Sequence, residues 1–184
     1  MLDIKAKLAR RLFVGMAIGA ASWLAACSSI DLGQAPALER QASWVVLPFV
    51  NHTETPLAGQ RAEAIAQAVL HAQGVGTVRS APAPGVQEAL FDAGDAARAQ
   101  EALAWARKNK LRYALAGSVE EWRYKVGVDG EPAVGVTLQF IDVNSGDVLW
   151  SGTGGQSGWS REALSAVAHK LVRGLLTAGL AQTR

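Results

Sequence analysis

One segment of the sequence alternates strictly between the two faces of a strand, and it places a β-sheet at the centre of the fold. In AVGVTLQFI, residues 133–141, one strand face would carry Val134, Val136, Leu138 and Phe140. The polar stretch DVNSGD then indicates a tight turn, and VLWSGT, residues 148–153, is expected to be the return strand. The sequence therefore predicts an antiparallel hairpin whose apolar face must be covered by other elements.

Helical periodicity supplies the covering elements. A first helix is expected to have Thr55 as its N-cap and to end at Gly74, a second to cover residues 95–108, and a third to follow Ser160 as its N-cap. Further strands are expected over residues 111–126, 75–80 and 43–50, the last with Pro48 at an edge, a bulge or the strand end. The expected order, β-α-β-α-β-β-β-α, predicts an α/β fold in which three main helices pack on a mixed sheet of about five strands.

The first 26 residues differ in character from the rest. Four basic residues precede LFVGMAIGAASWLAA, residues 12–26, which carries no charge. A basic start followed by a short apolar segment is typical of a secretory signal peptide. About fifteen apolar residues are fewer than the roughly 20 that a helix needs to cross a bilayer. We therefore expect residues 1–26 to be a signal peptide that is removed.

Cys27 is the only cysteine of the chain and follows this segment directly. LAAC, residues 24–27, resembles the lipobox of bacterial lipoproteins, whose cysteine is acylated and becomes the first mature residue. Fatty acyl chains such as palmitate would anchor the protein, because each buried CH₂ contributes about 0.8 kcal/mol. Ser28 stands where lipoproteins kept in the inner membrane often carry Asp, so the resemblance implies the periplasmic face of the outer membrane. A chance cysteine in an ordinary signal peptide or anchor is the alternative.

Removing the signal peptide changes the charge balance and leaves a chain of one-domain size. The signal takes four of the 18 basic and one of the 16 acidic residues, which leaves 14 against 15. The basic excess therefore belongs to the signal, and it gives no reason to expect a nucleic-acid partner. Residues 27–42, the lipidated N-terminus with SSIDLGQAPALERQA, are expected to form a short tether of at most about 50 Å. Residues 43–184 are expected to form a single periplasmic α/β domain.

Signatures of catalysis are sparse. His52, His71 and His169 lie far apart in the sequence and show no metal-ligand spacing. SGTGGQSGWS, residues 151–160, lies between a strand and a helix but lacks the lysine of a phosphate-binding P-loop, which favours a flexible connection. The chain has no G-x-S-x-G nucleophile elbow. We therefore expect no enzyme activity, no metal and no cofactor.

Two groups of residues leave alternatives open. Trp159 stands in the Gly/Ser-rich stretch, where it would either cover the edge of the core or enter a membrane interface. Acidic residues recur between residues 117 and 150, where they would form either a solvated face with its turns or an acidic surface for a cationic ligand. These acidic residues are Glu120, Glu121, Asp129, Glu131, Asp142 and Asp147.

Two stretches carry a family resemblance. WVVLPFVNHTETPLAGQRAEAIAQAVLHAQGV, and LAGSVEEW with VTLQFIDVNSGDVLWSGTGGQSG, are similar to a class of periplasmic lipoprotein domains. The class includes the curli-secretion lipoprotein, the peptidoglycan-synthase activator lipoproteins and the PelC-like lipoproteins of Pel exopolysaccharide export. One short hairpin is too little for the two membrane-spanning hairpins of the curli type. A tether over residues 28–42 is too short to reach an inner-membrane enzyme, so the chain is identified as a member of the PelC-like group.

This resemblance implies a function. PelC-like lipoproteins assemble beneath the outer membrane as a large ring, of about twelve subunits. The ring guides a partly cationic amino-sugar polysaccharide to an outer-membrane porin with its periplasmic scaffold, for export to the biofilm matrix. The resemblance implies aromatic residues at the membrane interface and an acidic surface that faces the polysaccharide. Our candidates for the membrane interface are Trp159 and, as second choice, Trp150; those for the acidic surface are Asp129, Glu131 and Asp142. The alternative is a monomeric adaptor lipoprotein that activates a cell-wall or polysaccharide enzyme.

Overall fold

A computed structural model describes residues 28–82, 94–127 and 130–182. The expected signal peptide, the expected acylation site Cys27 and the expected polysaccharide-facing residue Asp129 lie outside these residues.

The described part of the chain forms one mixed sheet with three helices. The strands are β1 (Ser28–Leu32), β2 (Trp44–Val46), β3 (Val50–Asn51), β4 (Val78–Ser80), β5 (Tyr113–Tyr124), β6 (Pro132–Asp142) and β7 (Val148–Ser157). The helices are α2 (Ala58–Ala72), α3 (Asp95–Lys108) and α4 (Leu164–Gly179). The spatial order of the strands is β1-β7-β6-β5-β2-β4, with β3 paired to β5 beside β2. The pairs that β5 makes with β2 and β3, and the β2–β4 pair, are parallel, whereas β5, β6, β7 and β1 are antiparallel.

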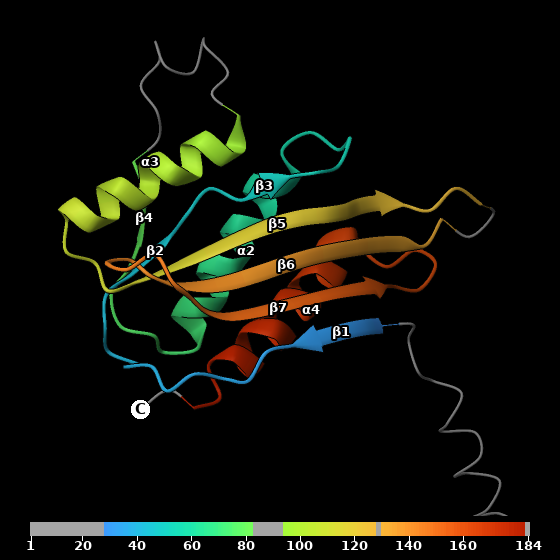
Figure 1. Cartoon of the computed structure of the whole chain (residues 1–184). Helices are drawn as coiled ribbons and strands as arrows, with labels where there is room; N and C mark the ends of the chain where they lie inside the picture. Colours follow the sequence, from blue (N-terminus) through green and yellow to red (C-terminus); the bar gives the residue numbers. More distant parts are fainter. Residues whose placement is uncertain (1–27, 83–93, 128–129, 183–184) are drawn as a thin grey trace, which may run out of the picture.

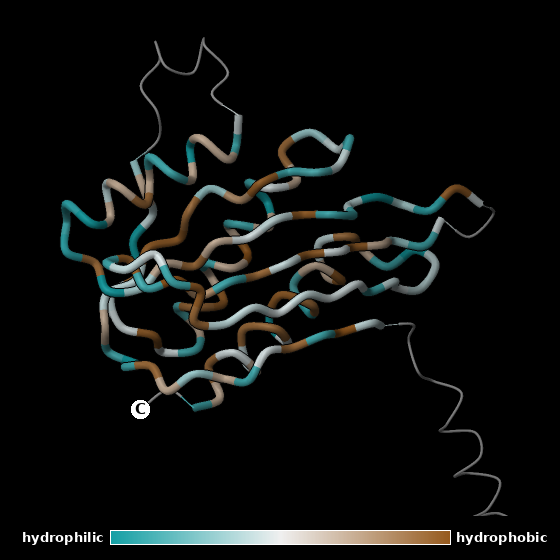
Figure 2. The backbone as a smooth tube through the Cα atoms, in the orientation of Figure 1, coloured by the Kyte–Doolittle hydropathy of each residue, from teal (hydrophilic) through white to brown (hydrophobic). Residues whose placement is uncertain are grey.

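The helices cover the two faces of the sheet unequally. α2 and α4 lie together on one face and close the larger core, whereas α3 covers the β2 side of the other face with a smaller cluster (Figure 1). In Figure 2 the hydrophobic stretches concentrate in the strands and in the helices behind them. The face opposite α2 and α4 therefore stays open over much of β6, β7 and β1.

Aromatic rings form the centre of the larger core. Phe140 lies 5.1 Å from Trp44 in an edge-on arrangement and 4.7 Å from Trp150, measured between ring centroids. Tyr113 adds a fourth ring, 5.0 Å from Trp44. All four side chains are buried. Trp44 and Phe140 thus hold β2 and β6 to the helices, with β5 between them in the sheet.

The α/β class, the mixed sheet and the three helices predicted from the sequence are confirmed. The hairpin of β6 and β7 has the expected buried face, and α3 has the expected bounds. Pro48 interrupts the first apolar run, because β2 ends at Val46 and β3 begins at Val50. The sheet exceeds the expected five strands because β3 is a separate strand and because β1 joins the other edge.

Both predicted N-caps are wrong. α2 begins at Ala58 after Leu57 in a left-handed conformation (φ 62°), and the Thr55 hydroxyl donates instead to the carbonyl of Trp122, at 2.5 Å. α4 begins at Leu164, four residues after Ser160. Thr55 is engaged in a tertiary contact, and Ser160 lies in a turn, so neither residue caps the helix that the local pattern assigns to it.

The glycine-rich stretch before α4 is a strand rather than a flexible connection. β7 continues to Ser157 and keeps its pairing with β6. A Cβ atom at Gly152 would lie 2.5 Å from the Trp150 ring, and one at Gly154 would lie 2.9 Å from Leu171 of α4. The missing side chains therefore let the ring and the helix pack directly on the strand.

The expected tether is also largely ordered. Ser28 to Leu32 form β1, whose register on β7 runs from the pair Ser28–Gln156 to the pair Leu32–Gly152. Farther along, Leu38 is buried in the larger core. Residues 28–42 are therefore not a free tether, because β1 pairs with β7 and Leu38 is buried in the larger core.

Candidate functional site

One end of the sheet gathers exposed apolar side chains. We call it the Trp159 end; here β5 ends, β6 begins, β7 ends and β1 begins. Trp159 is 66% exposed and follows the end of β7 by two residues; Tyr124, the last residue of β5, and Val126, two residues beyond it, are exposed as well. An exposed apolar group of this kind is typical of a contact with a partner or a lipid surface.

The carboxylate of Glu162 helps to hold the loop that carries Trp159. Glu162 accepts a hydrogen bond from the backbone N–H of Trp159 at 3.1 Å and an ion-paired hydrogen bond from Lys170 of α4 at 2.6 Å. The Lys170 ammonium, and after it the Trp159 N–H, hold the pKa of Glu162 below its usual value. The Glu162 carboxylate thus ties the loop to α4 and presents the indole at the Trp159 end.

Trp150 has a different environment. Its side chain is buried against Phe140, and its indole N–H donates to the carbonyl of Gly33 at 3.1 Å. The structure places Trp150 in the core, so its ring has no free surface for a membrane, which corrects the second choice for the membrane interface.

Glu131 and Asp142 lie at opposite ends of β6, although the sequence suggested one acidic surface. Glu131 flanks the start of β6 at the Trp159 end and forms an ion pair with Lys125 at 3.7 Å. Asp142 ends the same strand. Because a strand rises about 3.4 Å per residue, the two carboxylates are separated by roughly 35 Å. They do not belong to one site within a single copy of the chain.

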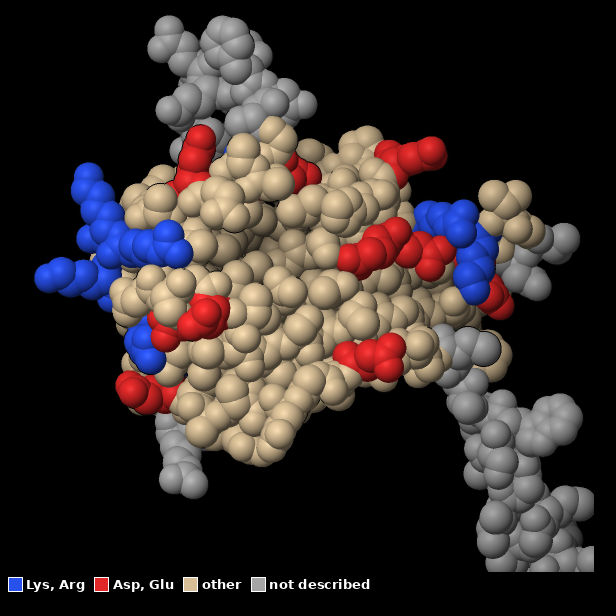
Figure 3. Space-filling model, viewed as in Figure 1, with Lys and Arg blue, Asp and Glu red and all other residues tan. Residues whose placement is uncertain are grey.

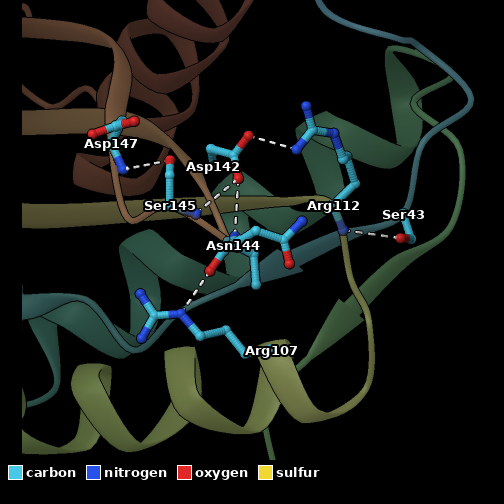
Figure 4. Close-up of polar contacts among 8 residues, drawn as sticks. Ser43, Arg107, Arg112, Asp142, Asn144, Ser145 and Asp147 are labelled. Carbon is cyan, nitrogen blue, oxygen red and sulfur yellow. Dashed lines mark hydrogen bonds and ion pairs between the residues drawn. The ribbon is translucent and has the colours of Figure 1, made fainter.

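Asp142 is committed to local contacts (Figure 4). It pairs with Arg112 at 2.5 Å and accepts hydrogen bonds from the backbone N–H groups of Asn144 at 2.9 Å and Ser145 at 3.3 Å. Loss of solvent at the carboxylate opposes ionisation, but the backbone N–H groups and the Arg112 guanidinium outweigh it and lower the pKa of Asp142. Its negative charge is therefore largely neutralised by Arg112 and by the backbone N–H groups of the β6–β7 turn.

A different set of acidic residues does come together. A bulge in β5 between Val119 and Glu121 lies beside the loop that follows β3, and the two enclose a recess of about 630 Å³. We call it the acidic recess; it is lined by Thr53, Glu54, Thr55, Glu120, Glu121, Trp122, Arg123 and Gly135. Figure 3 shows acidic side chains on this side of the molecule, toward the end where β5 finishes. Basic side chains lie beside them, and Arg123 and Lys125 pair with Glu121 and Glu131. The excess of negative charge is confined to the lining of the recess, which contains three carboxylates and one guanidinium.

The contacts within the acidic recess leave part of this charge uncompensated. Arg123 donates to Glu121 at 2.9 Å, and Ser118 donates to Glu120 at 2.5 Å. Among the described residues, neither Glu54 nor Glu120 has a cationic partner within salt-bridge distance. Nothing in the sequence groups Glu54 with these residues, because it lies at the recess only through the non-local pairing of β3 with β5.

A second hollow lies between the start of α2 and the start of α3. It includes Glu63, Asp95 and Arg98, has a volume of about 320 Å³, and holds an ion pair between Asp95 and Arg98. Burial raises the pKa of Glu63, and the Phe49 N–H and the Arg98 charge offset this only in part. Ionisation of Glu63 therefore lowers the free energy of unfolding.

Replacing Glu63 by glutamine is expected to stabilise the protein near neutral pH. A raised pKa in the folded state means that stability falls as the pH rises above the ordinary glutamate value, and the amide has no proton to lose. We expect the Tm to rise by roughly 1–2 °C at pH 7 and to be unchanged at pH 4. Thermal unfolding at both pH values measures this, with the exposed α3 residue Glu101 replaced by glutamine as control. A Tm gain of equal size at both pH values would contradict it.

The described residues offer neither a metal centre nor a membrane-spanning helix. No three His, Cys, Asp or Glu side chains in this part of the chain lie close enough together to hold a metal ion. No helix within the same residues is both long and apolar enough to cross a bilayer.

Known structures resemble this fold, although a scan against protein-family models and a search of curated proteins return no match. The PelC dodecamer from Paraburkholderia phytofirmans is 45% identical, with a TM-score of 0.71, over 85% of this chain and 99% of that one. A point variant of the same protein, also a dodecamer, is 44% identical with a TM-score of 0.70 and the same coverage. The lipoprotein GNA1162 from Neisseria meningitidis is 18% identical with a TM-score of 0.51, over 74% of this chain and 96% of that one, and it shares the fold.

Proposed function

The chain belongs to the PelC family, and we propose that it is a lipoprotein of the outer membrane whose ring guides a cationic, Pel-like exopolysaccharide toward an export porin. The observation that carries the proposal is the 45% identity to a PelC dodecamer across 85% of this chain. At this similarity the fold and the mode of assembly are expected to be shared. The polymer reaches the biofilm matrix through the porin and its periplasmic scaffold, and the ring needs no catalytic group to guide it.

The Trp159 end is the part of the ring that faces the membrane. Trp159 supplies an amphipathic ring of the kind that favours the membrane–water interface, and Tyr124 and Val126 extend the apolar contact. The chain would be anchored there by acyl chains on Cys27, the residue directly before β1. Anchoring and membrane contact are thus assigned to the same end of the domain.

Acidic residues at the Trp159 end are proposed to face the polymer. Asp129 and Glu131 belong to the β5–β6 connection, and Glu54 and Glu120 of the acidic recess lie near the same end. Repeated around a ring, these carboxylates attract a cationic chain without a tight site that would retain it. Asp142 is the weakest of the proposed polymer contacts, because Arg112 at 2.5 Å and two backbone N–H groups hold its charge, whereas Glu131 has only the longer pair with Lys125, at 3.7 Å.

The assembly and the transport roles are tested separately. Native mass spectrometry of the mature lipoprotein in detergent is expected to show a dodecamer. In a polymer-producing strain that lacks the gene, polymer is expected to accumulate in the periplasm and to return to the surface when the gene is restored. A monomer bound to a polysaccharide or cell-wall enzyme would contradict the ring and favour the adaptor function.

Reversing charge at the β5–β6 connection is expected to impair export while the ring remains intact. The double variant Asp129→Lys and Glu131→Lys should lower surface polymer by about tenfold, since electrostatic steering acts on the encounter with a charged chain. Glu101→Lys, on the outer side of α3, adds charge away from this end and serves as the matched control. Equal export by the double variant and the wild type would contradict the assignment of these acids.

A further inference from the structure

β1 is attached to β7 by its backbone along its whole length. Its pairing starts with Ser28 opposite Gln156 and ends with Leu32 opposite Gly152. The attachment continues one residue farther, because the Gly33 N–H donates to the Ser151 carbonyl at 2.9 Å and the Gly33 carbonyl accepts the Trp150 indole N–H at 3.1 Å. β1 is thus an integral edge of the sheet.

The glycines of β7 complement the side chains of β1. A Cβ atom at Gly154 would lie 3.4 Å from Ile30, and one at Gly152 would lie 3.1 Å from Leu32. The two β1 side chains therefore lie over positions where β7 has none. Beyond Gly33, burial of Leu38 in the larger core holds the following segment as well. Residues 28–38 are fixed to the domain at both ends.

This arrangement sets the distance between two membrane contacts. Ser28 directly follows Cys27, and its partner Gln156 precedes Trp159 by three residues. Three extended residues span at most about 10 Å. The chain beyond β7 is also held, because the Gly158 N–H donates to the Pro132 carbonyl at 2.8 Å and Glu162 fixes the Trp159 N–H. Ser28, the residue that follows the proposed acylation site, therefore lies close to Trp159.

We propose that β1 is a rigid strut that makes the acyl chains of Cys27 and the indole of Trp159 enter one lipid surface together, and so fixes the orientation of the domain on the membrane. This inference rests on the acylation of Cys27 and the membrane contact of Trp159 in the proposed function. A flexible tether of the same length would hold the domain near the membrane but leave it free to turn. The strut instead raises the effective concentration of the indole at the lipid surface.

An insertion that separates the lipid from the strut tests this inference. Six residues, Ser-Gly-Gly-Ser-Gly-Gly, are placed directly after Cys27, so that a serine still follows the acylated cysteine and β1 is untouched. The mature lipoprotein is reconstituted in phosphatidylethanolamine and phosphatidylglycerol vesicles whose acyl chains are brominated, and tryptophan fluorescence quenching is measured. The matched control carries the same six residues between Asn144 and Ser145, in the turn at the opposite end of the sheet.

The Trp159→Phe variant defines the part of the quenching that depends on this residue. We expect the insertion after Cys27 to abolish at least half of that part while the protein still floats with the vesicles, and the control insertion to leave it unchanged. Unchanged quenching after the Cys27 insertion overturns the strut and leaves the proposed function intact. Equal quenching in the wild type and Trp159→Phe overturns both the strut and the proposed membrane contact.

Discussion

Replacing Cys27 by serine, in a chain exported with a signal peptide whose removal does not depend on acylation, is expected to move the protein from the outer membrane to the soluble periplasmic fraction. The hydroxyl cannot form the thioether to a diacylglyceryl group, so the chain loses all its acyl chains. Each acyl CH₂ contributes about 0.8 kcal/mol to membrane binding, and even a single myristoyl chain gives a binding constant of only about 10⁴ M⁻¹. The exposed indoles of the ring alone are expected to retain less than about one tenth of the protein in the membrane fraction.

Density-gradient fractionation and mass spectrometry of the N-terminus measure this loss. Ser28→Asp is the matched variant, because it keeps the acylated cysteine and is expected to shift the lipoprotein to the inner membrane. Outer-membrane fractionation of Cys27→Ser at the level of the wild type would contradict lipid anchoring. The ring itself is expected to persist in Cys27→Ser, since the substitution changes none of the residues of the sheet and its helices.

The Phe140→Ala variant is expected to lose about 3–5 kcal/mol of unfolding free energy, the largest stability effect among our predictions. Phe140 is fully buried between Trp44 and Trp150, and its ring lies so near Gly179 that a Cβ there would come within 2.7 Å of it. Truncation therefore removes ring contacts from β2 and β7 and leaves a cavity under the end of α4. The surrounding backbone cannot collapse far into this cavity, because the sheet holds both neighbours in register.

Thermal unfolding followed by circular dichroism measures the effect. A loss of this size lowers the Tm of a domain of this length by roughly 6–20 °C. Gln139→Ala is the matched control, because its side chain lies on the open face of the same strand and is expected to change stability by less than about 0.5 kcal/mol. A Tm change in Phe140→Ala no larger than in Gln139→Ala would contradict the central place of the aromatic cluster.

The sequence predicted the elements that bury one regular face. β6 alternates with its apolar residues inward, and α3 and α4 show helical periodicity, so their type followed from local pattern. β1 was not predicted because its five side chains are all exposed and because its stability comes from pairing with a strand far along the chain. The end of β7 was not predicted because glycine disfavours strands, whereas here Gly152 leaves room for the Trp150 ring and Gly154 for Leu171 of α4.

The candidate site was predictable only in part. Trp159 stood out as a tryptophan without apolar neighbours, and the structure exposes it. Acidic residues could be found by their spacing, and the expected strand over residues 133–141 already lay between Glu131 and Asp142, although both were expected on one acidic surface. Glu54 lies near Glu120 only because β3 pairs with β5, and no local sequence pattern predicts such a pairing.

The edge formed by β1 and β7 also has a consequence for the order of folding. Ser28 and Gln156 are 128 positions apart, and a secreted chain leaves the inner membrane with its N-terminus first. Contacts of such high sequence separation form late, because the entropy of closing a long loop must be overcome first. On the proposed function, β1 directly follows the acylated residue, so it would be the first strand to be delivered and among the last to find its partner. Acylation at Cys27 would retain this early segment at the membrane surface until the rest of the sheet has formed.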